Sequence, residues 1–590
     1  MIKLFKPRIC LTKPLLPSLR LNNTFRLSRT YHYYPKSPAY SIRQFATTGI
    51  KPDTIPLNTP KKPRSNGYKK LFYIGIGLGL TGTILYYTND KFKHTILTID
   101  RVGVVVVAMT RCFALYKETL GQEFSSPEKR QEALSKTHQR AANITLKALE
   151  KNGGIYIKLG QHLSALTYLL PPEWTETMIP LQDKCPRSSV EEIEKMFETD
   201  LGLNLSDIFI EFDPNPIGVA SLAQVHIAKL RSNGGKVAVK VQHPSLKEFV
   251  PLDVELINMV FNLMYKAFPE YPLTWLGEET QNSIFTELDF TKEAENSKRT
   301  AEHFKDFTFL KIPKILQDEK RILIMEYVSG ARLDNLNYLK NHDIDPSQVS
   351  TCLTHIFNDM IFTPDVGLHC DPHGGNLAIK SVPTKKGYNF EIILYDHGLY
   401  RDIPLQIKRD YSHFWLAVLD NKIPEMKKYA NLIAGIEGEQ KFKIFISAIT
   451  GRTPEAVLNN EIKKKRSKNE VFEIQSQIND DNSGVLEDLM DILSNMPRMI
   501  LLILKTNDLT RHLDENLQSE LGPERTFLIM ANYCAKNVYD EQNELINIKD
   551  TGLTWVFQRT LNWFDYHKRL TTLFIYDIFL KFHNLRMRWF

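Results

Sequence analysis

Residues 368–380, with the sequence LHCDPHGGNLAIK, restrict what this chain can fold into more than any other stretch. Asp371 is followed five positions later by Asn376, and Asp396 comes directly after the apolar run EIILY. In phosphoryl-transfer sites of the protein-kinase type, an Asp and an Asn at this spacing face the acceptor oxygen and hold metal, and a later Asp after a strand holds Mg²⁺. A turn Asp or a capping Asn explains each residue singly, but all of them in this order favour such a site.

The chain upstream supplies two further parts that such a site needs. Lys240 ends the β-branched run VAVK, where a strand lysine would hold nucleotide phosphates. The segment NPIGVASLAQV precedes it between two predicted strands, and its small residues would let a backbone approach phosphate oxygens. A solvated strand lysine and an ordinary turn are the alternatives. The candidate residues of this phosphate loop are Gly218, Val219, Ala220 and Ser221.

Hydrophobic periodicity divides the body of the chain into three parts. Helical patterns fill most of 88–200. Short runs of period two follow, IFIEF, QVHIAKL and KVAVKVQ, and the last two are joined by the hairpin signal RSNGG. From 345 onward the chain is mostly helical, broken by NFEIILYDHG. These patterns predict an α+β protein with a small β-rich lobe at 201–330 and a larger helical lobe at 331–590.

The N-terminal region has the composition of a mitochondrial targeting sequence. Residues 1–50 contain nine Lys or Arg, several Ser and Thr, and no Asp or Glu. RQFAT at 43–47 resembles a matrix-peptidase site, which predicts a presequence at 1–45, a new N-terminus at Ala46 and a basic linker at 46–70. A basic disordered tail is the alternative. Because the net charge of +7 is concentrated here, it indicates targeting and no nucleic-acid partner.

Residues 71–87, LFYIGIGLGLTGTILYY, form an uncharged stretch that predicts one transmembrane helix. This length is near the lower limit for crossing a bilayer, and a buried core helix is the alternative. Lys69 and Lys70 flank the stretch, and more positive charge precedes it than follows it. The positive-inside rule then leaves the N-terminal side in the matrix, and the body in the intermembrane space on the mitochondrial inner membrane.

The rest of the composition narrows the possible sites. Six cysteines are scattered without a CxxC pair or zinc-like spacing, so Cys370 is predicted to be an incidental thiol, with a reactive thiol as the alternative. The charged segment 461–484 is predicted to be a solvated loop or helix. Residues 490–590 are predicted to pack into the core as helices, with membrane-surface contact as the alternative.

In these motifs the chain resembles the inner-membrane branch of the UbiB/aarF-domain family of atypical kinase-like proteins, over about residues 150 to 400. The family's Lys-x-Gly-Gln motif is here Lys158-Leu159-Gly160-Gln161. Its Glu-x-Asp motif corresponds to Glu287 and Asp289. The remaining matched positions are the helix-borne partner of the nucleotide lysine, Glu293, and the hinge expected to hold adenine, Glu326, Tyr327 and Val328.

The resemblance implies a bilobal protein-kinase-like fold with a family-specific helical extension that caps the cleft. Lys158 and Gln161 are three positions apart, so they share one helix face. In the family this helix crosses the cleft, and the two side chains would meet Glu287, Asp289 and the nucleotide region. A covered cleft disfavours a polypeptide acceptor and suits ATP hydrolysis or a small or lipid-like substrate.

The resemblance also implies a role for each motif residue toward ATP or ADP and Mg²⁺. Lys240 and Glu293 would orient the phosphates. Asn376 and Asp396 would hold the metal. Asp371 would be the candidate catalytic base.

Three functions remain open from the sequence. The first is an ATPase or a small-molecule or lipid kinase of the mitochondrial inner membrane that supports coenzyme Q or phospholipid homeostasis. The second is a nucleotide-binding pseudokinase scaffold in lipid or quinone transport. The third is a protein kinase, which the absence of an Ala-Pro-Glu element after Asp396 disfavours. Gly218 departs from the Ala-rich run of much of the family, which leaves the preference between ATP and ADP open. A lipid- or quinone-like small molecule is the expected partner.

Overall fold

The computed structural model describes residues 81, 83–165, 170–182, 185, 187–269, 274–459, 488, 491–492, 496–519 and 522–589. The chain divides into two compact units, Met1–Leu80 and Thr81–Phe590, and the described residues all belong to the second. The presequence, the linker, residues 71–80 and 82 of the predicted span, and the charged segment at 461–484 therefore lie outside the described residues. Within the described segments, no helix has both the length and the apolar character needed to cross a bilayer.

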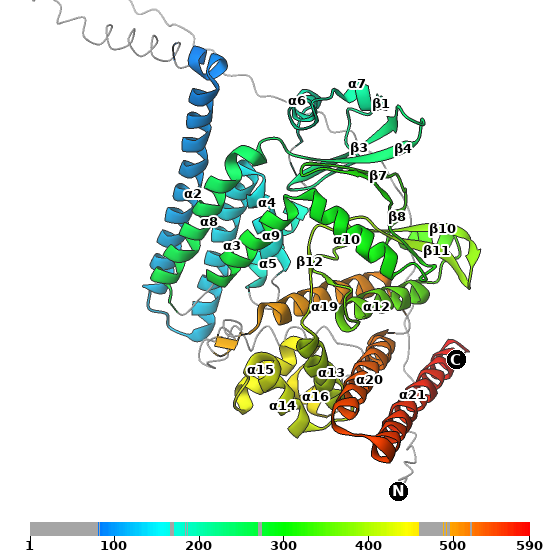
Figure 1. The fold of residues 1–590 in the computed structure, drawn as a ribbon. Helices are drawn as coiled ribbons and strands as arrows, with labels where there is room; N and C mark the ends of the chain where they lie inside the picture. The colour runs from blue at the N-terminus through cyan, green and yellow to red at the C-terminus, as the bar shows by residue number, and fades with distance from the viewer. Residues whose placement is uncertain are drawn as a thin grey trace, which may run out of the picture. The chain divides into compact units, whose positions relative to one another are not determined.

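The N-terminal helices of the described chain lie alongside one another (Figure 1). Arg101 of α2 joins two of them, because its Nε is 3.0 Å from Oδ1 of the buried Asp253 of α8. Ser126 caps α3, accepting a hydrogen bond from the backbone of Lys129. The elements of this part are α2 (Asp90–Leu120), α3 (Pro127–Asn152), α4 (Ile155–Ala165), α5 (Pro172–Met178), the 3₁₀ turn η1 (Ile179–Gln182) and α8 (Leu246–Ala267). The helices α6 (Val190–Leu201) and α7 (Leu205–Ile208) lie beside the sheet of the small lobe instead (Figure 1).

The small lobe is built on an antiparallel sheet with the strand order β1-β3-β4-β7-β6, and β2 also pairs with β3. The β3–β4 hairpin turns through Gly234, whose φ of +70° suits the NGG sequence. The strands are β1 (Phe209–Phe212), β2 (Gly218–Val219), β3 (Ala223–Leu230), β4 (Lys236–Gln242), β6 (Ile315–Asp318) and β7 (Ile322–Glu326).

The two faces of this sheet are covered by different helices. On one face, Val237, Val239 and Val241 of β4 pack against α6. On the other, Ala238 packs against α10 (Phe290–His303). Because successive side chains of a strand alternate between faces, Lys240 also points toward α10.

The larger lobe combines two small sheets with helices. One sheet has the order β5-β11-β10-β8, and β9 pairs with β12 in the other. These strands are β5 (Leu310–Lys311), β8 (Ala331–Arg332), β9 (Leu368–His369), β10 (Leu377–Lys385), β11 (Tyr388–Leu394) and β12 (Tyr400–Arg401). The remaining helices are α9 (Thr274–Glu287), α11 (Leu336–Asn341), α12 (Pro346–Phe362), α13 (Leu405–Leu419), α14 (Ile423–Ala434), α15 (Glu439–Thr450), α16 (Pro454–Leu458), α19 (Arg498–Leu517), α20 (Gly522–Lys549) and α21 (Gly552–Trp589).

The largest hydrophobic core surrounds α12, which packs against α19 and α20. The buried side chains of α12 include Ile356, Phe357 and Met360. The same core continues through β9, β10 and β11 to α4. The loops that carry Asp371 and Asp396 are therefore anchored on strands that the core holds in place.

The last helix, α21, is not buried in the core, although the sequence predicted core packing for the C-terminal segment. α21 packs along α20, and Arg569 Nη2 lies 2.7 Å from Oδ2 of Asp420. Many of its large apolar side chains are nevertheless exposed, because a single neighbouring helix covers only one side of it. They are Leu553, Val556, Phe557, Phe564, Phe574, Ile575 and Phe579.

Candidate functional site

A partly buried ion-pair cluster connects the sheet of the small lobe to the loop after β11. Lys240 Nζ lies 2.6 and 2.8 Å from the two carboxylate oxygens of Glu293, in the first turn of α10. The same Nζ is 2.9 Å from Oδ1 of Asp396. Asp396 is 156 positions beyond Lys240 in the chain, so only the fold brings the cluster together.

The cluster combines a protonated amine with an ionised carboxylate. Burial would raise the pKa of Asp396, but the Lys240 ammonium outweighs it and holds that pKa far below the usual range. Burial would lower the pKa of Lys240, but the carboxylates of Asp396 and Glu293 raise it. Burial also raises the pKa of Glu293, to about 7. At neutral pH the site therefore presents a cation for phosphate beside an anion for metal.

The side chains of Asn376 and Asp396 lie side by side, and each carries an oxygen atom that can bind a metal ion. Asn376 Nδ2 donates to Asp396 Oδ2 over 3.2 Å and to the backbone carbonyl of Asp371 over 3.1 Å. A tight turn holds Asn376, because its backbone N donates to the carbonyl of His373. Such oxygen donors fit Mg²⁺, which usually takes one or two protein ligands and completes its shell with phosphate and water. Among the described residues, no three His, Cys, Asp or Glu side chains are grouped as metal ligands.

Asp371 is held from two sides by lysines of helices that are far apart in the sequence. Lys158 Nζ of α4 lies 3.1 Å from Oδ2 of Asp371, and Lys505 Nζ of α19 lies 3.0 Å from Oδ1. Lys158 Nζ is also 3.0 Å from Oε2 of Glu287, at the end of α9. None of these side chains is more than 14% exposed. Both carboxylate oxygens of Asp371 are therefore engaged, and one of them ties α4 to this loop.

These ion pairs determine the proton affinity of Asp371. Burial would raise its pKa, but the ammonium groups of Lys158 and Lys505 hold the pKa well below the usual range. A carboxylate with so low a pKa is a poor proton acceptor at neutral pH. The two lysine contacts therefore lower the proton affinity of Asp371 and orient its carboxylate.

Two buried imidazoles support the loop without taking part in proton transfer. His369 Nδ1 accepts a hydrogen bond from the backbone N of Asp371 over 3.1 Å. His397 Nδ1 lies 3.1 Å from the hydroxyl of Tyr400. Burial lowers the pKa of His369 to about 4 and that of His397 to about 3. Both rings are therefore neutral at physiological pH and hold the loop in shape.

The predicted phosphate loop forms the turn between β2 and β3. Gly218 and Val219 make up β2, and Ala220 and Ser221 follow in the turn. The carbonyl of Ala220 accepts a hydrogen bond from His243 Nε2 over 3.0 Å. A Cβ added at Gly218 would meet no atom within 4 Å, so packing does not require a glycine there.

The residues of the predicted hinge make contacts within the protein. The carboxylate of Glu326 accepts from Lys311 Nζ over 2.8 and 2.9 Å. The Tyr395 hydroxyl donates to the carbonyl of Val328 over 2.9 Å. Tyr327 lies between these two engaged residues. The binding of adenine by this backbone stays a prediction.

Two residues expected beside Lys158 make other contacts. Gln161 Nε2 donates to the carbonyl of Leu181 over 3.0 Å and so ties α4 to η1. Asp289 caps α10, accepting from the backbone N of Thr291 over 3.2 Å and from its hydroxyl over 2.6 Å. Asp289 thus orients the helix of Glu293, because an N-cap side chain fixes the first turn.

Lys505 is the functional residue that the sequence reasoning did not find. It lies 134 positions after Asp371, outside every local motif. Its only signal is that it follows the apolar run MILLIL at 499–504, most of which is buried. A charged residue next to such a run is expected to have a partner, because a buried unpaired charge is strongly unfavourable.

Comparison with known proteins shows to which protein family this chain is related. A sequence model of the ABC1 atypical kinase-like domain matches residues 180–430. The ABC1 family protein MCP2 of Saccharomyces cerevisiae is 52% identical over 567 residues, 93% of this chain and 97% of that protein. The AarF domain-containing kinase 1 of Drosophila melanogaster is 35% identical over 475 residues, 80% of this chain and 89% of that protein.

A solved structure of Rv3197 from Mycobacterium tuberculosis in complex with erythromycin covers 66% of this chain and 98% of its own, with 19% identity and a TM-score of 0.38. Family membership is decided by the matched domain and by the sequence identities over most of the chain, and this structure plays no part in it. The resemblance seen in the Lys-x-Gly-Gln and Glu-x-Asp motifs is confirmed: the chain belongs to the ABC1 family of atypical kinase-like proteins, whose members include AarF domain-containing kinases.

Proposed function

We propose that this chain is a Mg²⁺-dependent ATPase or phosphotransferase that acts on a small or lipid-like acceptor. The observation that carries the proposal is the convergence of Lys240, Glu293 and Asp396, with Asn376 beside them. This set supplies a phosphate-binding cation and oxygen ligands for a divalent metal. Mg²⁺ bound there would neutralise charge on the phosphate oxygens.

Transfer of the γ-phosphoryl group needs a base for the acceptor. The bond from the γ-phosphorus to the bridging oxygen of ADP breaks, and a bond to the acceptor hydroxyl or to water forms. Asp371 takes the proton of that acceptor, after Lys158 or Lys505 has moved off its carboxylate. The direct tie between α4 and Asp371 supports an acceptor smaller than a polypeptide, because α4 stands where a peptide would approach.

Thermal melting of the purified full chain with ATP or ADP, with and without Mg²⁺, tests the nucleotide site. Nucleotide at 100 times its Kd should stabilise the protein by about 2.7 kcal/mol. We expect a shift in Tm that requires Mg²⁺ and is lost in Asp396→Asn. Arg332→Ala is a matched control, because Arg332 pairs with the neighbouring Asp334 and is 65% exposed. A folded protein that melts identically with and without nucleotide would refute the proposal.

A pseudokinase scaffold that binds nucleotide without turnover is the second candidate. The two lysine contacts of Asp371 favour it, since they lower the proton affinity of the candidate base. Asp371→Asn separates the two functions. An enzyme loses its cellular role in this variant, whereas a scaffold retains it.

We also propose a place for the protein on the mitochondrial inner membrane, in support of coenzyme Q or phospholipid homeostasis. The acid-free region at 1–50 and the uncharged stretch at 71–87 support this location. The exposed apolar side chains of α21 are consistent with contact to a membrane surface. Protease added to mitoplasts should digest the body if it lies in the intermembrane space, and protection of the body would refute that topology.

A further inference from the structure

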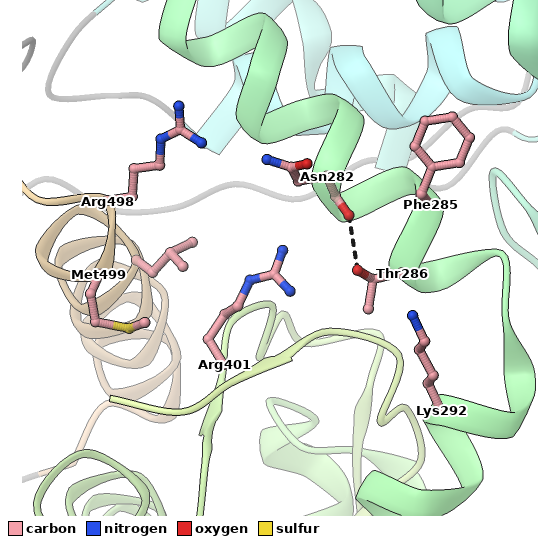
Figure 2. A pocket seen from close by; sticks show the side chains of 8 residues that line it. Asn282, Phe285, Thr286, Lys292, Arg401, Arg498 and Met499 are labelled. Carbon is pink, nitrogen blue, oxygen red and sulfur yellow. Dashed lines mark hydrogen bonds between the residues drawn. The ribbon is translucent and has the colours of Figure 1, made fainter. Parts of the chain in front are cut away.

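An open cavity of about 470 Å³ lies between α9, the start of α10, β12 and the start of α19. Lys292, Arg401 and Arg498 are among the residues that line it, and no Asp or Glu does. In Figure 2 the Arg401 side chain extends from β12 into the space between α19 and α9. Three cations from three separate elements thus face one hollow.

Two of the three cations of this cavity are not paired with a carboxylate of the protein. In the part of the chain that the structure describes, neither Lys292 nor Arg401 forms an ion pair with a carboxylate. Arg498 pairs with Glu278, but both side chains are about half exposed, at 49% and 61%. Such an exposed pair contributes little and exchanges readily with a ligand. Unpaired cations in a concave site indicate an anionic ligand, and arginines favour the planar or tetrahedral oxygens of carboxylate or phosphate.

The same cavity has an apolar side. Phe285 of α9 lines it and is 48% exposed, so its ring is accessible from the cavity. Met499 and the buried Leu502 line the side formed by α19. An anionic group bound by the arginines and lysine would therefore have apolar surface next to it. This combination suits an amphiphile better than a purely polar anion.

The cavity adjoins the residues that surround Asp371. Thr286, which also lines it, directly precedes Glu287, the partner of Lys158. Leu502 is one helical turn, roughly 5 Å along the axis, before Lys505 on α19. The cavity therefore lies against α9 and α19, the two helices that also carry Glu287 and Lys505.

We propose that this cavity binds the acceptor of the reaction, an amphiphile that carries a phosphate or carboxylate group next to an apolar portion. The inference rests on the proposed function, because it assigns the cavity to the acceptor of that reaction. Lys292 and Arg401 hold the anionic group, and Phe285 contacts the apolar portion.

Direct binding to the purified full chain tests this proposal with three probes. They are dihexanoyl phosphatidic acid, the uncharged dihexanoylglycerol, and inorganic phosphate. We expect phosphatidic acid to bind at least about tenfold more tightly than dihexanoylglycerol, as for a charge-assisted contact. The double variant Lys292→Ala/Arg401→Ala should lose this preference. Lys298→Ala is the matched control, because Lys298 lies on the same helix but pairs with Asp318 over 2.9 Å.

A second variant distinguishes an anionic lipid from free phosphate as the ligand. Phe285→Ala should weaken the binding of phosphatidic acid several-fold and leave the binding of inorganic phosphate unchanged. If inorganic phosphate binds as tightly as phosphatidic acid and Phe285→Ala changes the affinity for neither, the proposal that the ligand is an amphiphile is refuted. Equal binding of the charged and neutral lipids, or no loss in the double variant, refutes the anion site. The nucleotide-dependent shift in Tm is measured on the same samples. A protein that shows this shift but does not bind phosphatidic acid refutes the cavity proposal alone, whereas the loss of the shift refutes the nucleotide site.

Discussion

Lys505 Nζ of α19 lies 3.0 Å from Oδ1 of Asp371, in a contact that spans 134 positions of the chain. Lys158 Nζ of α4 approaches the other carboxylate oxygen to 3.1 Å. The candidate base is thus held between one helix before the small lobe and one helix near the C-terminus. Release of either contact would raise the proton affinity of Asp371, because both ammonium groups lower its pKa.

Lys505→Met tests the contact from α19. Removing the ammonium frees Oδ1 of Asp371 and lets its pKa rise, because one of the two lysines that oppose the effect of burial is lost. We expect basal ATP hydrolysis to rise several-fold, measured as phosphate release at saturating Mg²⁺-ATP. Lys536→Met, at an exposed position of α20, should leave the rate unchanged. A fall in the rate would show that Lys505 assists the reaction instead of restraining Asp371.

Lys158→Ala tests the contact from α4. The change leaves the buried Glu287 without its cation and frees Oδ2 of Asp371. We expect a loss of about 3 kcal/mol in the free energy of unfolding, as for breaking a buried pair. Self-labelling from γ-labelled ATP should increase, since α4 is no longer tied to the loop. Adding Glu287→Gln should recover part of the stability, and a double variant no more stable than the single one would contradict the pairing.

Gly160→Ala tests why the Lys-x-Gly-Gln motif contains a glycine. A Cβ at Gly160 would lie 2.1 Å from Cδ1 of Leu181 and 3.0 Å from Cδ1 of Leu149, both buried. Overpacking of this kind costs about 1–3 kcal/mol, which chemical denaturation measures. Gly103→Ala is the control, because its Cβ would meet nothing within 4 Å. In a helix interior that change should stabilise by roughly 0.5–1 kcal/mol.

Lys408 predicts a pH dependence of stability that is separate from the site. The residue is buried, and its Nζ donates to the carbonyl of Thr363. Burial lowers its pKa from 10.5 to about 8. Below about pH 8 both the folded and unfolded states are protonated, and the buried charge destabilises the fold. As the pH rises from 8 toward 10.5 only the unfolded state keeps the proton, so the destabilisation is relieved.

The comparison with Lys408→Met isolates this effect from other titrating groups. Between about pH 7.5 and 9.5, the stability of the natural chain relative to this variant should rise by about 1–2 kcal/mol. Urea denaturation at each pH provides the measurement. A difference that stays constant over this range would show that Lys408 titrates normally.

The sequence by itself determined the parts of the site that are local. Asp371 and Asn376 are five positions apart, so one turn brings them together, and the apolar strand β11 delivers Asp396 beside them. The alternation of Val237, Val239 and Val241 likewise places Lys240 on the opposite face of its strand. The helices and strands of the small lobe follow from the same short-range periodicities.

Only the tertiary structure decided which distant side chains meet at this site. Lys505 pairs with Asp371, whereas Gln161 and Asp289 make contacts elsewhere, and no spacing in the sequence distinguishes these outcomes. The cavity of Lys292 and Arg401 also exists only where α9, α10, β12 and α19 meet. Periodicity reports which face of an element is apolar, but the packing of elements against a shared core sets which charged groups come within a few ångströms of each other.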